Sequence, residues 1–356
     1  MNLESHIQTI LEAALQAPSG ENSQPWKFSV HGNTIELYND EASDLSLYND
    51  SNRGSYVAHG AAIENICIAA SATGYRASVT LFPRPGNGEP IASIILTPHA
   101  AKNIEDIKLY ECIPVRTSNR KPYKKEPLKP EHEAALSAAV QTLGATVLYK
   151  RITSPQQMYA MAVVGATNEE VMLQNKSLHQ FFFSHLTWSI EEDAKKKVGF
   201  FIRTLELPMP VRGLFKLIRH WSVMKVCIAL GFPKVVQKAN AATNFSAAEF
   251  GLLTTRGDTP QDFVATGRTL QRIWLTATSL GVEMQVLTGT IFLDFAHKAH
   301  PEAFSTHEKS LIHTQIETLY SMLTNKREVV TCMFRIGYGE SPSARATRYT
   351  LEERLM

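Results

Sequence analysis

The sequence predicts an α+β protein in which two related halves are joined in one chain. Residues 60–74 and 267–281 both begin and end with glycine, carry apolar residues at helical spacing, and lie 207 positions apart at both ends. A strand-like run follows each of them, at residues 91–97 and 329–337. Any two amphipathic helices could share such spacing, but the matching glycines and the matching order of elements favour an internal duplication.

The chain opens with a helix and two short strands. Apolar residues recur at intervals of three and four between residues 7 and 14, and Pro18 ends this helix. Alternating apolar residues at 26–30, a turn at Gly32 and a second apolar run at 35–37 predict a pair of strands. We therefore expect mixed or antiparallel sheets flanked by helices.

The two halves are expected to span residues 1–110 and 111–356. A stretch rich in proline and lysine, residues 121–130, predicts a solvated connection before the helical pattern around residues 134–143. Residues from about 176 to 244 have no counterpart in the first half. We interpret them as an insertion.

The insertion contains a predicted basic amphipathic helix. Its apolar stripe consists of Leu214, Leu217, Ile218, Trp221 and Met224. The residues off that stripe are basic: Lys216, Arg219, His220 and Lys225. Such a helix could pack on its own domain, close over a ligand as a lid, or lie on a membrane surface.

Composition excludes several classes of protein. Of the 356 residues, 44% are hydrophobic and 20% charged, as in folded globular proteins, and the net charge of +2 creates no overall field for nucleic acid or an anionic membrane. No run of about 18 apolar residues predicts a membrane span. The four cysteines lack paired metal spacing and are too few for a disulfide scaffold, which favours a reducing, cytoplasmic location.

A metal site is not predicted. Asp294, His297 and His300 recur every three residues. The first and last of these side chains diverge around a helix, so solvated or capping roles fit them better than coordination.

The loop at residues 17–26 is dense in small and hydrogen-bonding side chains. Pro18 fixes the backbone, Gly20 permits close passage of a ligand, and Ser19 and Asn22 offer polar contacts to ring heteroatoms. A helix C-cap followed by a turn explains the same residues equally well.

A second polar run, Arg116 to Arg120, has the sequence Arg-Thr-Ser-Asn-Arg. The planar fork of an arginine suits phosphate, because it donates two parallel charge-assisted hydrogen bonds. Taken alone, the run could equally be an exposed basic turn before Pro122.

Both stretches resemble signatures of the nitroreductase superfamily. Loop 17–26 resembles the segment that covers the isoalloxazine ring of flavin mononucleotide (FMN) from the neighbouring subunit, and residues 116–120 are similar to the family's Arg-x-Ser-x-Arg/Lys element for FMN. The resemblance implies that Arg116 pairs with the phosphate, with Thr117 beside it. It implies that Ser118 binds the phosphate or the pyrimidine ring. Arg120 would lie near flavin N1 and the C2 carbonyl, where a cation stabilises the reduced ring.

Two further stretches extend the resemblance. Residues 334–339, followed by Arg345 and Arg348, resemble the closing strand and the arginine that completes the phosphate site, and either arginine could serve. Residues 281–289 resemble the loop whose backbone N–H faces flavin N5, which implies that Leu287 and Gly289 contact the cofactor; a tight turn is the alternative.

The distribution of these signatures predicts one composite site. Loop 17–26 lacks a clear copy in the second half, and residues 116–120 lack one in the first. The chain thus resembles the long, fused, Acg-like branch, in which a single polypeptide forms an internal pseudo-dimer.

The resemblance implies an FMN-dependent oxidoreductase that passes electrons from NADH or NADPH to an electron-poor small molecule such as a nitroaromatic or a quinone. No catalytic residue is assigned, because the flavin itself carries the chemistry. An FMN-storage protein closed by a lid is the alternative. A scaffold without flavin that docks a partner or membrane surface is a third hypothesis.

Overall fold

The computed structural model describes residues 3–101 and 103–356, so residues 1, 2 and 102 of the expected first half lie outside the described residues. It contains two four-stranded antiparallel sheets of identical topology, with strand orders β1-β2-β4-β3 and β5-β8-β10-β9. In each sheet the strands follow the order first, second, fourth, third. The α+β fold with two related halves is therefore confirmed.

The first sheet and its helices come from the beginning of the chain. Their bounds are α1 (Ser5–Leu15), β1 (Trp26–His31), β2 (Thr34–Asn39), α2 (Arg53–Ala72), β3 (Tyr75–Leu81), β4 (Ala92–Pro98) and α3 (Ile104–Cys112). The predicted opening helix and strand pair correspond to α1, β1 and β2. Trp26, Phe28, Ile35 and Leu37 alternate inward and are fully buried.

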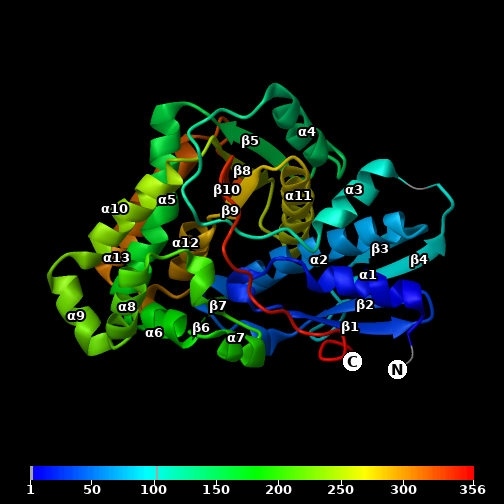
Figure 1. Ribbon diagram of the computed structural model, residues 1–356, viewed down its shortest axis with the longest axis horizontal. Helices are drawn as coiled ribbons and strands as arrows, with labels where there is room; N and C mark the ends of the chain where they lie inside the picture. Colours follow the sequence, from blue (N-terminus) through cyan, green and yellow to red (C-terminus); the bar gives the residue numbers. More distant parts are fainter. Residues whose placement is uncertain (1–2, 102) are drawn as a thin grey trace.

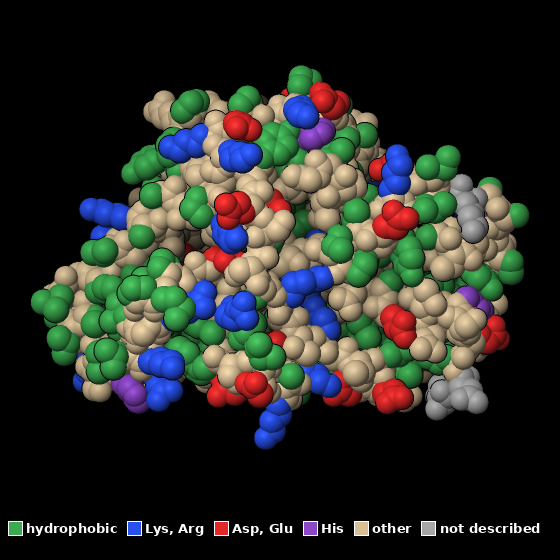
Figure 2. Space-filling model, in the orientation of Figure 1, with side chains coloured by type: hydrophobic (Ala, Val, Ile, Leu, Met, Phe, Trp, Pro, Cys, Tyr) green, Lys and Arg blue, Asp and Glu red, His purple; other side chains and the backbone are tan. Residues whose placement is uncertain are grey.

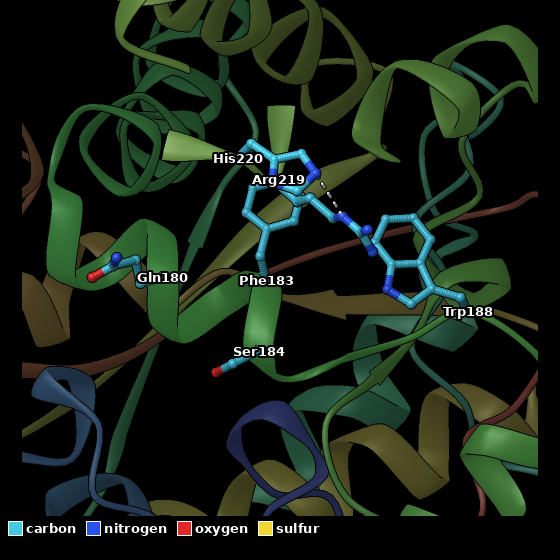
Figure 3. Close-up of a pocket in the computed structure, with 6 residues that line it drawn as sticks. All are labelled: Gln180, Phe183, Ser184, Trp188, Arg219 and His220. Atoms are coloured by element: carbon cyan, nitrogen blue, oxygen red, sulfur yellow. Dashed lines mark hydrogen bonds between the residues drawn. The ribbon is translucent and has the colours of Figure 1, made fainter. Parts of the chain in front are cut away.

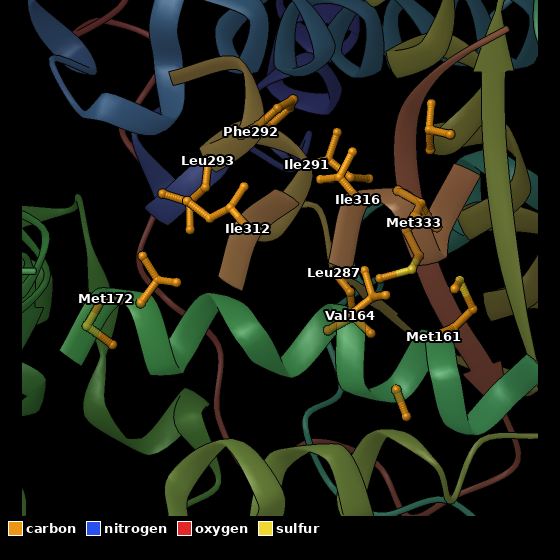
Figure 4. Close-up of a cluster of buried hydrophobic side chains, with 14 of the residues drawn as sticks. Met161, Val164, Met172, Leu287, Ile291, Phe292, Leu293, Ile312, Ile316 and Met333 are labelled. Carbon is orange, nitrogen blue, oxygen red and sulfur yellow. The ribbon is translucent and has the colours of Figure 1, made fainter. Parts of the chain in front are cut away.

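The second sheet repeats this order with additional helices. Its elements are α4 (Pro130–Gln141), β5 (Leu148–Ile152), α5 (Pro155–Gln174), β8 (Glu249–Thr255), α11 (Pro260–Ser279), β9 (Glu283–Val286), α12 (Gly289–Ala299), α13 (Thr306–Ser321) and β10 (Val329–Gly337). Figure 4 shows the core that α5, α12, α13 and β10 enclose, where Met161, Val164, Ile316 and Met333 interdigitate.

Helices α2 and α11 are the repeated segments that the glycine spacing predicts. Each is 20 residues long, and both their first and their last residues lie 207 positions apart. The two helices cross at the centre of the molecule (Figure 1). They form the main contact between the halves.

Residues 176–244, which the sequence predicts to be an insertion, form a chain of short elements. These are α6 (Lys176–Ser184), β6 (Leu186–Thr187), α7 (Ile190–Lys196), β7 (Phe200–Phe201), α8 (Met209–Ile218), α9 (Trp221–Ala229) and α10 (Phe232–Asn244). The prediction of one helix through residues 214–224 is wrong, because extended backbone at His220 separates α8 from α9. Ile218 and Met224 of the predicted stripe are fully buried, whereas Leu217 is exposed.

The C-terminal residues return to the first half. Phe28 of β1 donates its backbone N–H to Arg354 O and accepts from Met356 N, at 2.8 and 2.9 Å. Arg354 also bonds the Asp40 carboxylate at 2.9 Å. The last residues therefore tie the two halves together (Figure 1). Among the described residues, no helix is both long and apolar enough to cross a membrane.

Candidate functional site

Loop 17–26 adopts a strained conformation. Glu21, Asn22 and Gln24 have φ values of 49°, 56° and 51°, in the left-handed region that non-glycine residues rarely adopt. The Ser19 hydroxyl supports the turn by accepting a 3.0 Å hydrogen bond from Gln24 N. Strain of this kind persists only where the surroundings hold the backbone in place.

Those surroundings are the insertion and the C-terminal segment. The Asn22 side-chain amide donates to Lys197 O and Thr347 O, both at 2.9 Å. Gln24, which is fully buried, donates to Lys197 O at 2.7 Å and accepts from Tyr349 N at 3.0 Å. The loop from the first half is thus fixed by two segments of the second half.

Three arginines meet next to this loop. Arg345 donates to the backbone oxygen of Arg116 at 2.9 Å, and Arg348 bonds the Asn22 side chain. Arg116 is buried, donates to Gln16 O at 3.1 Å, and lies over the Trp274 ring at 4.4 Å. The structure therefore brings both C-terminal candidate arginines to Arg116.

The arginine cluster has a net positive charge that its neighbours leave uncompensated. Burial, with repulsion from Arg348 and Arg345, holds the pKa of Arg116 well below its usual range. Burial and Arg345 likewise lower the pKa of Arg348 to about 10. Within the described part of the chain, no carboxylate forms a salt bridge with these three arginines, and the buried Arg116 Nε has no hydrogen-bond partner. This arrangement suits a phosphate, whose oxygens would supply the missing acceptors and the opposite charge.

The remaining residues of the Arg116–Arg120 run differ in their surroundings. Thr117 bonds locally to Val115 O at 3.2 Å, and Ser118 is half-buried next to it. Arg120 donates to Thr204 O at 2.9 Å, and its guanidinium lies 5.5 Å from the centre of the Phe200 ring. Thr204 and Phe200 belong to residues 176–244, so Arg120 is the residue through which the Arg116–Arg120 run contacts that segment.

Two polar residues that sequence reasoning missed hold this part of the fold together. Asn119 is fully buried; its backbone N–H donates to Met284 O at 3.0 Å and its side chain to Glu340 O at 2.7 Å. Arg335 on β10 is also fully buried and donates to Gln285, Thr243 O and Lys121 O. Since all three nitrogens of its guanidinium donate to these partners, Arg335 has a structural role.

Leu287 and Gly289 lie at the start of α12, facing α5. Leu287 donates its backbone N–H to Met333 O at 2.7 Å. A Cβ atom added to Gly289 would overlap the Asn168 side chain, so a larger residue there would have to displace Asn168. Next to Asn168, burial raises the pKa of Glu169 to about 7. Among the described residues, Asn168 Oδ1 and Glu169 Oε2 are buried without a hydrogen-bond partner.

Residues 190–206 of the insertion cover the site. Gly199 donates its N–H to Glu21 O at 2.8 Å, and the Asp193 carboxylate accepts from both the backbone and the hydroxyl of Thr347, at 2.8 and 2.6 Å. We call residues 190–206 the covering segment. It contacts both loop 17–26 of the first half and Thr347 of the C-terminal segment.

Comparison with known proteins places the chain among relatives from Mycobacterium tuberculosis. No family model matches it. It is 23% identical over 354 residues to the uncharacterized protein MT1398 of strain CDC 1551, covering 97% of this chain and 48% of that protein. It is 27% identical over 175 residues to "Putative NAD(P)H nitroreductase Rv3131" of strain H37Rv, covering 48% of this chain and 50% of that protein.

The third relative is "Putative NAD(P)H nitroreductase acg" of strain H37Rv, 26% identical over 177 residues, covering 50% of this chain and 53% of that protein. The chain thus spans about half the length of the curated relatives it matches first. The chain is therefore similar in sequence to these putative nitroreductases, and its two halves of one sheet topology agree with the long, fused form that the sequence resembles.

Solved structures show weaker likeness. The FMN-dependent nitroreductase NfnB from Mycobacterium smegmatis is 14% identical, with a TM-score of 0.39 over 69% of this chain and 96% of that one. A putative nitroreductase from Anabaena variabilis is 12% identical, with a TM-score of 0.44 over 95% of this chain and 74% of that one.

Proposed function

We propose that this protein binds one FMN molecule between its halves and is an NAD(P)H-dependent oxidoreductase. The observation that carries the proposal is the cluster of Arg116, Arg345 and Arg348, three cations gathered beside the strained loop 17–26 of the other half. A cluster of this kind lowers stability unless an anion compensates it, and a phosphate monoester at neutral pH is close to doubly charged.

Each part of the site has a proposed role. Arg116, Arg345 and Arg348 would hold the phosphate through charge-assisted hydrogen bonds. The residues proposed to surround the ring are Pro18, Ser19 and Asn22 from the first half, and Thr117, Ser118, Arg120, Leu287 and Gly289 from the second. When bound, FMN would supply the redox chemistry, taking hydride from NADH or NADPH and reducing an electron-poor acceptor such as a nitroaromatic or a quinone.

The chain's own residues would orient the cofactor and exclude water. Arg120 is the cation of this set that lies away from the arginine cluster, against Phe200, and would favour negative charge on a bound ring. The division into residues 1–110 and 111–356 is part of the proposal. A site divided in this way would let one chain act as its own pseudo-dimer.

Titration of purified protein with FMN tests the assignment. Arg116→Ala should weaken FMN binding by about 1.5–3 kcal/mol, because a charge-assisted pair to phosphate is lost. Arg203→Ala, which removes an exposed arginine of the covering segment, is the matched control and should bind FMN normally. Equal affinity of Arg116→Ala and the native protein would refute the phosphate assignment, and failure of the native protein to bind FMN would refute the proposed function.

The covering segment favours a second candidate function, storage of FMN with little turnover. Asn22, Gln24 and Arg120 all bond to residues of the insertion, so reductant must pass this segment to reach a bound ring. Deleting residues 176–244 is a poor test, because Ile218 and Met224 belong to the core around α5.

Asp193→Ala is a gentler change, since it removes the two bonds between the covering segment and Thr347. The exposed Glu191 on the same helix provides the control Glu191→Ala. Under anaerobic mixing with NADH or NADPH, bleaching of bound flavin in the native protein supports the oxidoreductase. Bleaching only in Asp193→Ala supports storage behind a closed cover.

A further inference from the structure

Helices α8, α9 and α10 form an unusually basic part of the chain. Residues 207–248 contain no aspartate or glutamate. They contain six basic residues: Arg212, Lys216, Arg219, Lys225, Lys234 and Lys238. The whole protein has a net charge of only +2, so this segment carries a local positive charge that the overall composition conceals.

The same helices expose large apolar side chains. Those with more than a third of their surface accessible are Met209, Leu217, Val223, Val226, Leu230 and Val235. Single exposed apolar residues are ordinary, but five of these six lie within three consecutive helices and the sixth, Leu230, directly follows α9. Figure 2 shows hydrophobic side chains gathered at the end of the molecule that α8 and α9 form, at the left of the view, with Lys or Arg side chains nearby.

The exposed residues follow one side of each helix. On α8 the exposed positions include Met209, Gly213, Lys216 and Leu217, and Gly213 lies three or four residues from each of the other three. The opposite side is occupied, since Ile218 is fully buried against the core around α5. We call the exposed sides of α8, α9 and α10 the basic apolar face. Packing on the protein accounts for the buried side of these helices, and no other part of the described chain covers this face.

Most charges of the face are not neutralised within the protein. Lys234 lies 3.2 Å from the carboxylate of Glu170. The other five basic residues form no salt bridge with an acidic residue of the described chain. The face begins at Met209, after the covering segment ends at residue 206, and the half-buried Phe215 of α8 packs against Phe201 and Ile202 of that segment.

A shallow, open depression lies beside the turn between α8 and α9. Its volume is about 310 Å³, and its lining includes Arg219, His220, Phe183 and Trp188. Figure 3 shows Arg219 extending toward the Trp188 ring. Aromatic rings beside cations are typical of side chains that sit at a membrane–water interface.

We propose that the basic apolar face docks onto an anionic membrane surface. Leu217, Val226 and Leu230 would enter the headgroup region, while the lysines and arginines around them would attract the anionic lipids. A nucleic acid fits less well, because the same docking would press apolar side chains against a polyanion. The electrostatic share of the binding must weaken as salt is added.

Co-sedimentation of the full-length protein with vesicles tests the proposal. The protein should sediment with vesicles of phosphatidylcholine mixed with phosphatidylglycerol, and remain in solution with phosphatidylcholine alone. Lys216→Glu with Lys225→Glu should lower partitioning by at least about fivefold per changed residue, since each basic residue near such a surface contributes on the order of 1 kcal/mol. The triple variant Leu217→Ser, Val226→Ser and Leu230→Ser should lower partitioning onto the vesicles even at low salt.

A double variant of the first half, Leu45→Ser with Lys108→Glu, is the control, because both residues are exposed and distant in sequence from the face. It should partition like the native protein. All variants change exposed residues, and an unchanged thermal midpoint verifies folding. Sedimentation that does not depend on anionic lipid, or that survives both sets of substitutions, would overturn the proposal. So would a native dimer that the apolar substitutions convert to a monomer, since a second copy would then be the occupant.

Discussion

Gly60 and Gly267 face each other where the two central helices cross. A Cβ atom added to Gly60 would overlap the backbone oxygen of Val264, and one added to Gly267 would overlap that of Val57. The contact is reciprocal, because residues 57 and 60 correspond to residues 264 and 267 in the repeat. This is the geometry of an isologous twofold interface, here formed within one chain.

Substitution of either glycine should therefore weaken the packing between the halves. We expect Gly60→Ala and Gly267→Ala each to lower the free energy of unfolding by roughly 1–3 kcal/mol or more, because backbone atoms must move to admit the methyl group. Because the two sites touch, the double variant should lose less than the summed effects. Urea denaturation measures the free energy of unfolding of the two single variants and the double variant.

Gly213→Ala is the matched control for this prediction. Gly213 also lies within a helix, but a Cβ atom there would meet open space. Alanine should be neutral or stabilise by up to about 1 kcal/mol, in line with its helix propensity. If Gly60→Ala behaved like Gly213→Ala, close packing at the crossing would not be what holds the helices together.

A buried ion network provides a second connection between the halves. Glu64 on α2 is fully buried and lies 2.6 Å from Arg272 and 3.0 Å from Arg268, both on α11. Asp106 on α3 also contacts Arg272, at 3.1 Å. Beside them, Gln271 donates to Asn65 at 2.7 Å.

Glu64→Gln should destabilise the protein by about 3 kcal/mol, because it leaves the buried Arg272 and the half-buried Arg268 with one fewer counterion. Retained contact with Asp106 keeps the loss at the lower end of the usual range. Thermal and urea denaturation at neutral pH measure it. Glu89→Gln, which breaks an exposed pair with Arg84, should change little. Equal effects of the two substitutions would contradict a structural role for the buried network.

The sequence predicted the elements whose signals are local. Glycine spacing located α2 and α11, and apolar periodicity located α1. The composite site was expected because loop 17–26 and residues 116–120 each occur in one half only, and the structure does bring Arg116 and Asn22 to the same C-terminal arginine, Arg348.

What the sequence did not reveal depends on contacts between distant residues. Gln24 and Lys197 are 173 positions apart, and Asn119 and Glu340 are 221 apart. Neither pair belongs to a periodic pattern. The break between α8 and α9 was also missed, because the apolar stripe continues through His220 at helical spacing although the backbone there is extended.

The arginine cluster should oppose folding until an anion is bound. Arg348→Met removes one of three repelling charges as well as a bond to Asn22, so the thermal midpoint of the ligand-free protein should change little. The increase in midpoint that FMN produces should fall by half or more, because stabilisation by a ligand follows its affinity.

Arg203, already used as a control position above, is here changed to methionine, and Arg203→Met is the control for this measurement. It should keep the full increase in midpoint with FMN. Inorganic phosphate should stabilise the native protein and not Arg348→Met. An Arg348→Met protein that responds to both anions like the native one would exclude Arg348 from the phosphate site.

The last prediction concerns pH. Burial, with a smaller contribution from Asp44, raises the pKa of Glu21 from 4.5 to about 8, whereas nearby Lys196 acts in the opposite direction. The folded protein thus keeps a proton that the unfolded chain releases above about pH 4.5. By linkage, this group's contribution to stability is present below pH 4.5, declines as the pH rises toward 8, and falls no further above that.

Glu21→Gln resembles the protonated side chain at every pH. The variant should match the native protein near pH 5 and exceed its stability near pH 8, by an amount on the order of a few kcal/mol. Urea denaturation across this range measures the difference, with the exposed Glu131→Gln as control. Because Gly199 and the covering segment rest on Glu21, its ionisation should also loosen the cover. Parallel pH curves for the native protein and Glu21→Gln would show that this carboxyl is ionised in the folded state throughout.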